Sequence, residues 1–355
     1  MQKKLLLVHH FPLSSVTGVT VMAAEMLALV PALSDDIDVH YEHYDGVDEP
    51  EALARRLDKR HADATCVVGI NLHIEVGWDK SLALAGWCAG RGIPLFNNVQ
   101  DYWPHHYESL RELADRQGAR LLASSDFVAG QLRDNGFAAD RLQMGAQLPK
   151  PGPTATSTRP IIAAVGRIVR RKRFPDVVRA FRLAGLDRTA SLRLTLVPSQ
   201  VFQSAQDDEQ MNLVRAEMAA PGFDAEAVQL VAGPVVPPSY GDLAAYVCAS
   251  DYEGFSMTPY EAAYCGCPPI VSDIPPHRHM AENLFAENAK DFIYPVGDCR
   301  ALADILTDEV ATGRRRHHLH ARLDLVRHTV EDGFSVKVTA RALADLVHAA
   351  AGPAR

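Results

Sequence analysis

Short apolar runs alternate with helix-like segments over the first 135 residues of the chain. The apolar runs predict buried strands, and the segments between them predict helices. This alternation is typical of a parallel sheet covered by helices. The expected strands are residues 4–10, 38–44, 65–70, 93–98 and 120–123, and the expected helices are residues 19–30, 51–59, 81–90, 109–117 and 125–135.

A segment rich in Pro, Ser and Thr, Pro149–Pro160, interrupts this pattern, and the alternation then begins again. We therefore expect two α/β domains, residues 1–150 and 161–336, joined by a linker at 151–160. A C-terminal helix near 337–355 can pack back onto the first domain. Ligands of open parallel sheets bind at the carboxyl ends of the strands, which suggests a cleft between the two sheets. The expected strands of the second half are 161–165, 192–197, 228–232, 245–248 and 268–273, and its expected helices are 175–183, 258–265, 302–309, 314–328 and 336–350.

Composition restricts the classes of protein that fit this pattern. The 355 residues are 47% hydrophobic and 23% charged, as in ordinary globular proteins, and no apolar run approaches the ~20 residues that span a bilayer. The apolar part of the N-terminal segment, Leu5–Val8, is too short for a signal peptide and predicts a buried strand. The six cysteines form no C-x-x-C pair, so a reduced, cytoplasmic compartment is the simplest inference.

Charge and one loop exclude two kinds of ligand. The formal net charge of −8 argues against nucleic acid, although it excludes neither a local basic pocket nor a peripheral membrane contact. A dinucleotide-binding fold needs Gly-x-Gly-x-x-Gly after its first strand, but here the loop has one glycine, Gly18, after Thr17. An NAD or FAD site is therefore not expected. Gly18 either only eases the turn or lets a substrate approach the helix.

Two carboxylates flank a predicted helix start at Thr258. Glu253 precedes a glycine in a loop, and Glu261 lies in the first turn of the helix. The N–H groups and partial positive charge of a helix start can hold phosphate, and nearby carboxylates suit a ligand that also carries hydroxyls, such as a sugar nucleotide. The alternative for Glu261 is a capping box in which Thr258 is the N-cap and Glu261 reaches back.

A basic segment, Gly166–Phe174, follows the first strand of the second domain. Arg167 and Lys172 would project from the loop after this strand. A guanidinium binds phosphate through two parallel hydrogen bonds, and an ammonium adds a compact charge, so the pair would stabilise a diphosphate leaving group. The alternative is a solvated basic turn. That is the expected state of the remaining arginines of the segment, Arg170, Arg171 and Arg173.

Taken together, these motifs resemble a retaining glycosyltransferase of the GT-B fold, family 4. The resemblance covers about residues 161–334 and is carried by Gly166-Arg167 with Lys172, Glu253-Gly-Phe through Glu261-Ala, Gly266-Cys-Pro and Ser272-Asp-Ile-Pro-Pro. It is weaker in the first domain, where the matching segments are Thr17-Gly18, Asp101-Tyr-Trp and Ser124-Ser125. It implies two Rossmann-like domains with parallel sheets that face a central cleft, the first on the acceptor side and the second binding the nucleotide sugar.

The resemblance also implies roles for individual residues. Glu261 would hold the ribose hydroxyls of the donor, Arg167 and Lys172 its diphosphate, and Glu253 the transferred sugar. The other substrate-binding candidates that follow from it are Phe255, Ser256, Met257, Thr258 and Val235 in the second domain, and Thr17, Gly18 and Asp101 in the first.

The reaction implied by the resemblance keeps the anomeric configuration. The acceptor hydroxyl would attack from the face that the diphosphate leaves, and a donor phosphate oxygen would take its proton, so that no protein base, metal or other cofactor is required. Ser272 to Arg278 is similar to mannosyl-transferring members and points to a GDP-linked donor, while a UDP-linked donor stays equally open. Three positions depart from the family pattern: Gln100 replaces a histidine, Val197-Pro-Ser replaces a glycine-rich turn, and Thr17 replaces a glycine.

Histidines add one further candidate. His73, just after the third strand, could contact the donor sugar or transfer a proton, although a lone loop histidine is more often a structural hydrogen-bonder. The other histidine groups have no acidic or cysteine partners at metal-ligand spacing, so no metal site is expected. The arginine-flanked group from Arg314 predicts a solvated helix.

Three functions are compatible with these residues. The first is a glycosyltransferase. The second is a glycoside hydrolase or phosphorylase with Glu253 and Glu261 as acid and base, which needs carboxyl groups roughly 5–5.5 Å apart for retention or ~6.5–9.5 Å apart for inversion. The third is a non-catalytic nucleotide-sugar-binding partner subunit, which the departures in the first domain leave open. The resemblance favours the first.

Overall fold

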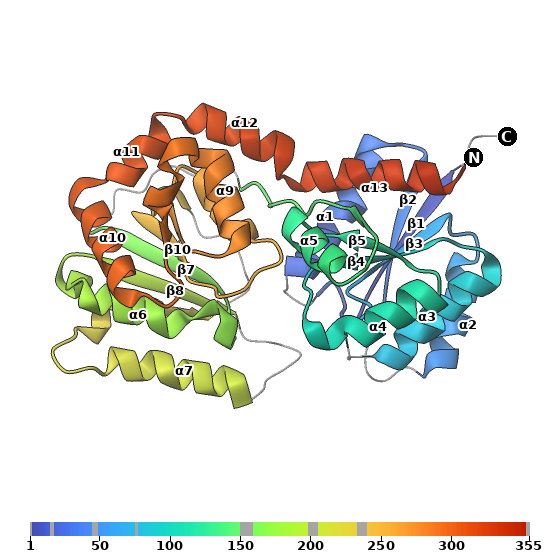
Figure 1. Cartoon of the computed structure of the whole chain (residues 1–355), viewed down its shortest axis with the longest axis horizontal. Helices are drawn as coiled ribbons and strands as arrows, with labels where there is room; N and C mark the ends of the chain where they lie inside the picture. The colour runs from blue at the N-terminus through green and yellow to red at the C-terminus, as the bar shows by residue number, and fades with distance from the viewer. Residues whose placement is uncertain are drawn as a thin grey trace. The chain divides into compact units, whose positions relative to one another are not determined.

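The computed structural model describes residues 2–14, 18–44, 49–74, 77–149, 159–197, 205–232 and 240–352. The chain divides into two compact units, residues 1–145 with 334–355, and residues 146–333 (Figure 1). Each unit is built on a six-stranded parallel sheet with helices, which confirms the predicted α/β fold class. Most of the predicted linker lies outside the described residues.

The sheet of the first unit has the strand order β2-β1-β3-β4-β5-β6. Along β1, the side chains of Leu5 to Val8 are at most 2% exposed, as the apolar run predicts. The chain passes from β1 to β2 on one side and then to β3 on the other, which places a topological switch point between β1 and β3. The strands are β1 (Lys3–His9), β2 (Ile37–His43), β3 (Cys66–Ile70), β4 (Leu95–Val99), β5 (Arg120–Ala123) and β6 (Ala139–Arg141).

Helices cover both faces of this sheet. Leu6 and Val8 pack with α2 and α3 on one face, because alternate residues of a strand point the same way. The other face is covered by α1, against which α13 packs after returning from the far end of the chain (Figure 1). The helices of this unit are α1 (Gly18–Leu33), α2 (Pro50–His61), α3 (Trp78–Arg91), α4 (Tyr107–Arg111), α5 (Asp126–Asp134) and α13 (Val336–Ala350), with short turns η1 (Pro104–His106) and η2 (Glu112–Arg116).

The sheet of the second unit has the strand order β12-β11-β10-β7-β8-β9. From β7 the chain builds β8 and β9 on one side and then crosses to β10 on the other, so the switch point of this sheet lies between β7 and β10. Its strands are β7 (Ile161–Arg167), β8 (Ser191–Val197), β9 (Val228–Ala232), β10 (Ala245–Cys248), β11 (Pro269–Ser272) and β12 (Ile293–Tyr294).

The helices of the second unit form two groups. Helices α6, α7 and α10 pack against one apolar core of the unit (Figure 1). Helices α8 and α9 contact α12. The helices are α6 (Phe174–Leu183), α7 (Ala205–Met218), α8 (Met257–Tyr264), α9 (Pro275–Phe285), α10 (Cys299–Thr312), α11 (Arg314–His320) and α12 (Leu323–Gly333). The short turns are η3 (Arg170–Lys172), η4 (Leu186–Arg188), η5 (Ala225–Ala227), η6 (Tyr240–Asp242) and η7 (Ala286–Phe292).

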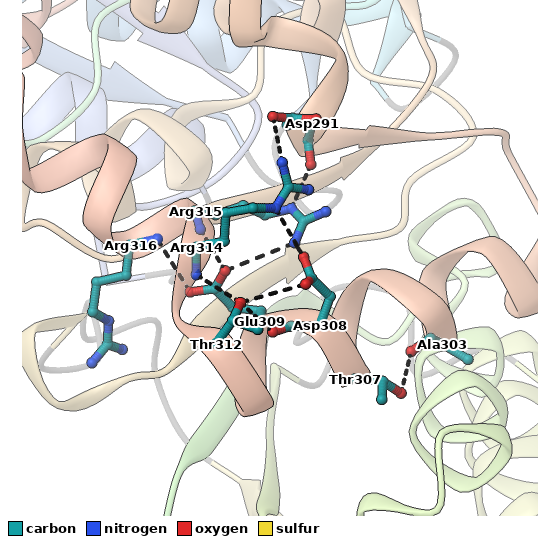
Figure 2. A network of polar contacts seen from close by, with 9 residues as sticks. All are labelled: Asp291, Ala303, Thr307, Asp308, Glu309, Thr312, Arg314, Arg315 and Arg316. Carbon is teal, nitrogen blue, oxygen red and sulfur yellow. Dashed lines mark hydrogen bonds and ion pairs between the residues drawn. The ribbon is translucent and has the colours of Figure 1, made fainter.

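A charged cluster is buried where α10 meets α11 (Figure 2). Glu309 is 4% exposed and accepts hydrogen bonds from the backbone N–H groups of Arg315 and Arg316, at 2.8 and 3.1 Å. The guanidinium of Arg315, which is also buried, donates to Asp308 at 2.7 Å. The prediction of a solvated helix from Arg314 is therefore wrong for Arg315, because carboxylates from α10 enclose its charge.

Several other elements differ from the prediction. The expected helix 314–328 is two helices, α11 and α12, and α9, β6 and β12 were not predicted. No helix among the described residues is both long enough and apolar enough to cross a membrane. All six cysteines are free thiols.

Candidate functional site

The switch point of the second sheet brings two loops together. The loop after β7 holds the basic segment, and the loop after β10 holds Glu253. The two loops are joined by the backbone as well as by side chains, since the N–H group of Asp251 donates to the carbonyl oxygen of Arg171 at 2.9 Å. Ligands of open α/β sheets bind at such a point, so these loops form the candidate site.

Glu253 is held from three sides. Its Oε1 accepts from the Lys172 ammonium at 2.5 Å and from the Ser250 hydroxyl at 2.7 Å. Its Oε2 accepts from the Arg171 guanidinium at 2.7 Å. The side chain of Glu253 is 6% exposed, whereas those of Lys172 and Arg171 are 17% and 20% exposed. The carboxylate is thus fixed, and its cations still reach solvent.

These contacts determine the charge of Glu253. Burial alone would raise the pKa of Glu253, but the charges of Arg171 and Lys172 and the hydrogen bonds outweigh it and hold the pKa far below its ordinary value. Glu253 is therefore a carboxylate at any physiological pH. The prediction that Arg171 is solvated is wrong, because its guanidinium pairs with Glu253 and also donates to the carbonyl oxygen of Tyr252 at 2.9 Å. Arg170 is exposed, as predicted.

Glu261 has a different environment. It is 4% exposed in α8, and its Oε2 accepts from the hydroxyl of Tyr240 at 3.0 Å. Burial raises the pKa of Glu261 to about 7, although hydrogen bonds from Tyr240 and from the backbone of Gln147 act in the opposite direction. No cation contributes to this pKa shift. Glu261 is therefore partly protonated near neutral pH, whereas Glu253 is fully ionised there.

The predicted capping box at the start of α8 is wrong. Ser256, not Thr258, is the N-cap residue, so Glu261 lies five positions after the cap, whereas a capping box needs it three positions after. The hydroxyl of Thr258 instead accepts from Tyr246 at 2.7 Å. The side chain of Ser256 makes no capping hydrogen bond to α8.

The other predicted residues of the second unit lie near these loops in the chain. Arg167 ends β7 and is partly buried, and the Lys172 side chain passes over Gly166, where an added Cβ would lie 3.4 Å from its Cε. Phe255 stacks on Tyr260, with ring centroids 5.3 Å apart, and Met257 begins α8. Val235 lies outside the described residues.

In the first unit, His73 is fully buried after β3. Its Nε2 donates to the carbonyl oxygen of Asp101 at 3.3 Å, and its Nδ1 accepts from Asn97 at 3.3 Å. Burial lowers the pKa of His73 to about 3, so the ring is neutral. The structure thus favours the alternative that His73 is a structural hydrogen-bonder. Gly18 begins α1, and Thr17 lies outside the described residues.

Sequence reasoning did not identify four side chains that hold the site: Arg171, Ser250, Tyr240 and His277. Ser250 lies three positions before Glu253, a spacing that could have suggested a local hydrogen bond. The other three reach the site from distant parts of the chain. Among the described residues, no group of three or more His, Cys, Asp or Glu side chains could hold a metal ion.

Comparison with known proteins identifies the second unit. Residues 150–322 match the family model described as glycosyl transferases group 1. No curated protein sequence matches the chain significantly.

Solved structures resemble the whole chain. A glycosyltransferase from Rickettsia africae is 16% identical over 99% of this chain and 100% of its own, with a TM-score of 0.71. A sucrose-phosphate synthase from Thermosynechococcus elongatus is 16% identical over 98% and 99%, with a TM-score of 0.72. A pneumococcal O-GlcNAc transferase in complex with UDP and GlcNAc is 15% identical over 85% and 60%, with a TM-score of 0.60.

Two parallel sheets of this topology, with a glycosyl transferases group 1 domain on the second, are the architecture of the GT-B fold. The family match is thus confined to the second unit, and the likeness to the solved structures gives the whole chain the GT-B fold.

Proposed function

We propose that this glycosyltransferase moves a sugar from a nucleoside-diphosphate donor to an acceptor hydroxyl with retention of configuration, as in family 4. The observation that carries the proposal is the ionised, buried Glu253, held by Lys172, Arg171 and Ser250 at the switch point beside the start of α8. A fixed carboxylate next to partly exposed cations and a helix start suits a ligand that combines hydroxyls with phosphates.

In this proposal the cations of the loop after β7 hold the diphosphate. Lys172 keeps donor hydrogens beyond the one given to Glu253, and Arg167 ends the adjoining strand. Both stabilise the negative charge that develops on the leaving diphosphate. The N–H groups at the start of α8 add a further positive end.

Glu253 then orients the transferred sugar rather than moving a proton. Because its pKa lies far below neutrality, it cannot donate a proton and is a weak base. A donor phosphate oxygen takes the proton of the acceptor hydroxyl, and the reaction needs no protein base, metal or other cofactor. Glu261 accepts from the ribose hydroxyls, and the first unit holds the acceptor.

The two other functions have less support. A glycoside hydrolase would use Glu253 and Glu261 as its carboxyl pair, but the family model that residues 150–322 match is one of glycosyl transferases. Nothing in the described residues favours a non-catalytic partner subunit. UDP is bound in two of the similar structures, which supports testing a UDP-linked donor first and a GDP-linked one second.

The six free thiols accord with the reduced cytoplasm.

The test begins with thermal-shift screening against UDP, GDP, ADP and dTDP, since a ligand of the native state raises Tm. The nucleotide that binds is then titrated calorimetrically into Arg167→Ala and Glu261→Ala, with exposed Arg170→Ala as the control. We expect Arg167→Ala and Glu261→Ala each to lose about 1–3 kcal/mol of binding free energy, and the control to lose none. Unchanged binding in both folded variants would refute the site, and nucleotide-independent release of sugar from an oligosaccharide would favour the hydrolase.

A further inference from the structure

The ring of His277 contacts two parts of the candidate site, Ser272 at the end of β11 and Ser256 at the start of α8. It lies in the first turn of α9 and is 0% exposed. Its Nδ1 lies 2.9 Å from the carbonyl oxygen of Ser272, at the end of β11, and its Nε2 lies 3.1 Å from the hydroxyl of Ser256. Because a carbonyl oxygen only accepts, Nδ1 carries a hydrogen. Nε2 then accepts from Ser256 in the neutral ring and donates to it in the charged ring, so the two groups stay joined in either state.

This contact explains why Ser256 does not cap its own helix. A serine at the N-cap position ordinarily accepts a hydrogen bond from an N–H group in the first turn. Here the hydroxyl of Ser256 turns to His277, and the thiol of Cys248 lies 3.7 Å away on the same side. The N-cap residue consequently leaves the helix start uncapped by its own side chain. A serine cap bonds the N–H group of the second or third helical residue, and Pro259, the third, has none, which leaves Thr258 as the donor that a cap would occupy. The N–H group of Met257, the first helical residue, has no acceptor within the helix either.

Nδ1 of His277 is linked to Glu253 through Ser272 and Ser250. The hydroxyl of Ser272 donates to the carbonyl oxygen of Ser250, and the hydroxyl of Ser250 donates to Glu253 at 2.7 Å. His277 therefore holds both ends of the Ser250–Ser256 loop, one through Ser272 and the other through Ser256. All members of this chain of hydrogen bonds are buried.

We propose that His277 is a positioning residue for sugar transfer, which keeps the hydroxyl of Ser256 away from the start of α8 and fixes the Ser250–Ser256 loop. The N–H groups of Met257 and Thr258 thereby stay available to the donor phosphate, at a fixed position relative to Glu253. The inference rests on the proposed function, because it assigns His277 to the same donor site.

Two amide substitutions separate the two contacts of the ring. The amide of His277→Asn can replace Nδ1 at Ser272 but is too short to reach Ser256, whereas the amide of His277→Gln extends to the place of Nε2. The probe is whichever of UDP, GDP, ADP and dTDP binds the wild-type protein. We expect His277→Asn to weaken its Kd about tenfold and His277→Gln less than threefold. His279→Asn, an exposed position on the same helix, serves as the control.

A structural role alone would give a different result. If both variants lower Tm equally while the folded protein binds the nucleotide as tightly as wild type, the inference is wrong. If the wild-type protein binds none of the four nucleotides, the proposed function itself fails, so the two failures are distinguishable.

A double variant tests the mechanism of the effect. In His277→Asn the released hydroxyl of Ser256 can bond to the N–H group of Thr258 and compete with phosphate. Removing that hydroxyl as well, in His277→Asn with Ser256→Ala, is therefore expected to restore part of the lost affinity. A further loss of affinity in the double variant would show that the two side chains act independently, and would overturn the inference.

Discussion

The starts of α11 and α8 use similar residues in opposite ways. At α11, the carboxylate of Glu309 accepts from the N–H groups of Arg315 and Arg316 in the first turn, and the Arg315 guanidinium lies 3.8 Å from it (Figure 2). At α8, Glu253 turns to Lys172 and Arg171, and Ser256 turns to His277. Both sites thus contain a buried glutamate, arginines and a helix start.

The difference lies in which groups are paired with one another. At α11 the protein supplies its own anion, so the helix start is satisfied and contributes to stability. At α8 the side chains of Glu253 and Ser256 bond to groups outside the helix, and Ser256 does not cap it. A helix start that binds a ligand can therefore be recognised because the side chains that could cap it form hydrogen bonds with other groups instead. Four predictions test this contrast.

The largest effect is expected for Glu253→Gln. The neutral amide no longer balances Lys172 and Arg171, so the unfolding free energy should fall by roughly 3 kcal/mol and kcat/KM by about 100-fold or more. Urea unfolding and steady-state kinetics measure the two changes. The matched control is Asp251→Asn, whose carboxylate is 36% exposed two positions earlier. Turnover within tenfold of wild type would contradict the role of Glu253.

The unfolding free energy should depend on pH through Glu261, which, unlike Glu309, accepts no hydrogen bond from the first N–H groups of a helix. Its pKa in the folded state, about 7, lies above the ordinary value of 4.5, so the protonated form stabilises the fold. This contribution is complete below pH 4.5 and is lost as the pH rises towards 7, by up to about 3 kcal/mol. The unfolding free energy of wild type relative to Glu261→Gln should therefore decrease from pH 5 to pH 8. Parallel curves for the two proteins in urea unfolding would refute it.

Removing the anion of α11 should affect stability alone. Glu309→Ala leaves the N–H groups of Arg315 and Arg316 without their acceptor, and we expect a loss of about 2 kcal/mol in unfolding free energy. Calorimetry should find nucleotide binding unchanged. Glu287→Ala, at an exposed position of the same unit, is the control. Weakened nucleotide binding in Glu309→Ala would remove the distinction between the two helix starts.

The smallest effect is expected in the loop after β7. Arg171→Gln loses one of two cations on Glu253 and should cost about 1–2 kcal/mol of unfolding free energy. The neighbouring Arg170→Gln is exposed and should change it by less than ~0.5 kcal/mol. Chemical unfolding of both variants makes the comparison, and equal costs would mean that Arg171 does not hold Glu253.

Local patterns predicted most elements of the fold. The apolar runs at β5, β9 and β10, and the helix α13, were predicted with the bounds that the structure has. These elements have strong periodicity and clear ends. The helix α9 was not predicted because it opens with Pro275 and Pro276, which resemble a turn although proline is well accommodated in the first turn of a helix. The strand β12 has only two residues, too few for a pattern.

The candidate site was predicted in outline but not in its pairing. Glu253 and Lys172 were identified as candidates, whereas their direct contact and the role of Arg171 depend on residues about 80 positions apart in the chain. The capping box failed for a related reason. The pattern at Thr258 satisfies a local rule, but Tyr246 from the neighbouring strand takes its hydroxyl. Local rules do not include tertiary partners, which decide the outcome at buried polar positions.

The return of α13 to the first unit has a consequence for how the protein is made. Val336, Ala340, Leu343 and Val347 are buried, and Thr339 donates to the carbonyl oxygen of Gln143 at 2.7 Å. This helix leaves the ribosome only after the whole second unit, which at 5–20 residues per second takes roughly 10 to 40 s. Throughout that time the nascent first unit has an uncovered apolar face on α1. Chaperones that bind apolar surface would therefore meet this unit first, and a gene fragment that ends at residue 145 would encode a domain without its final layer.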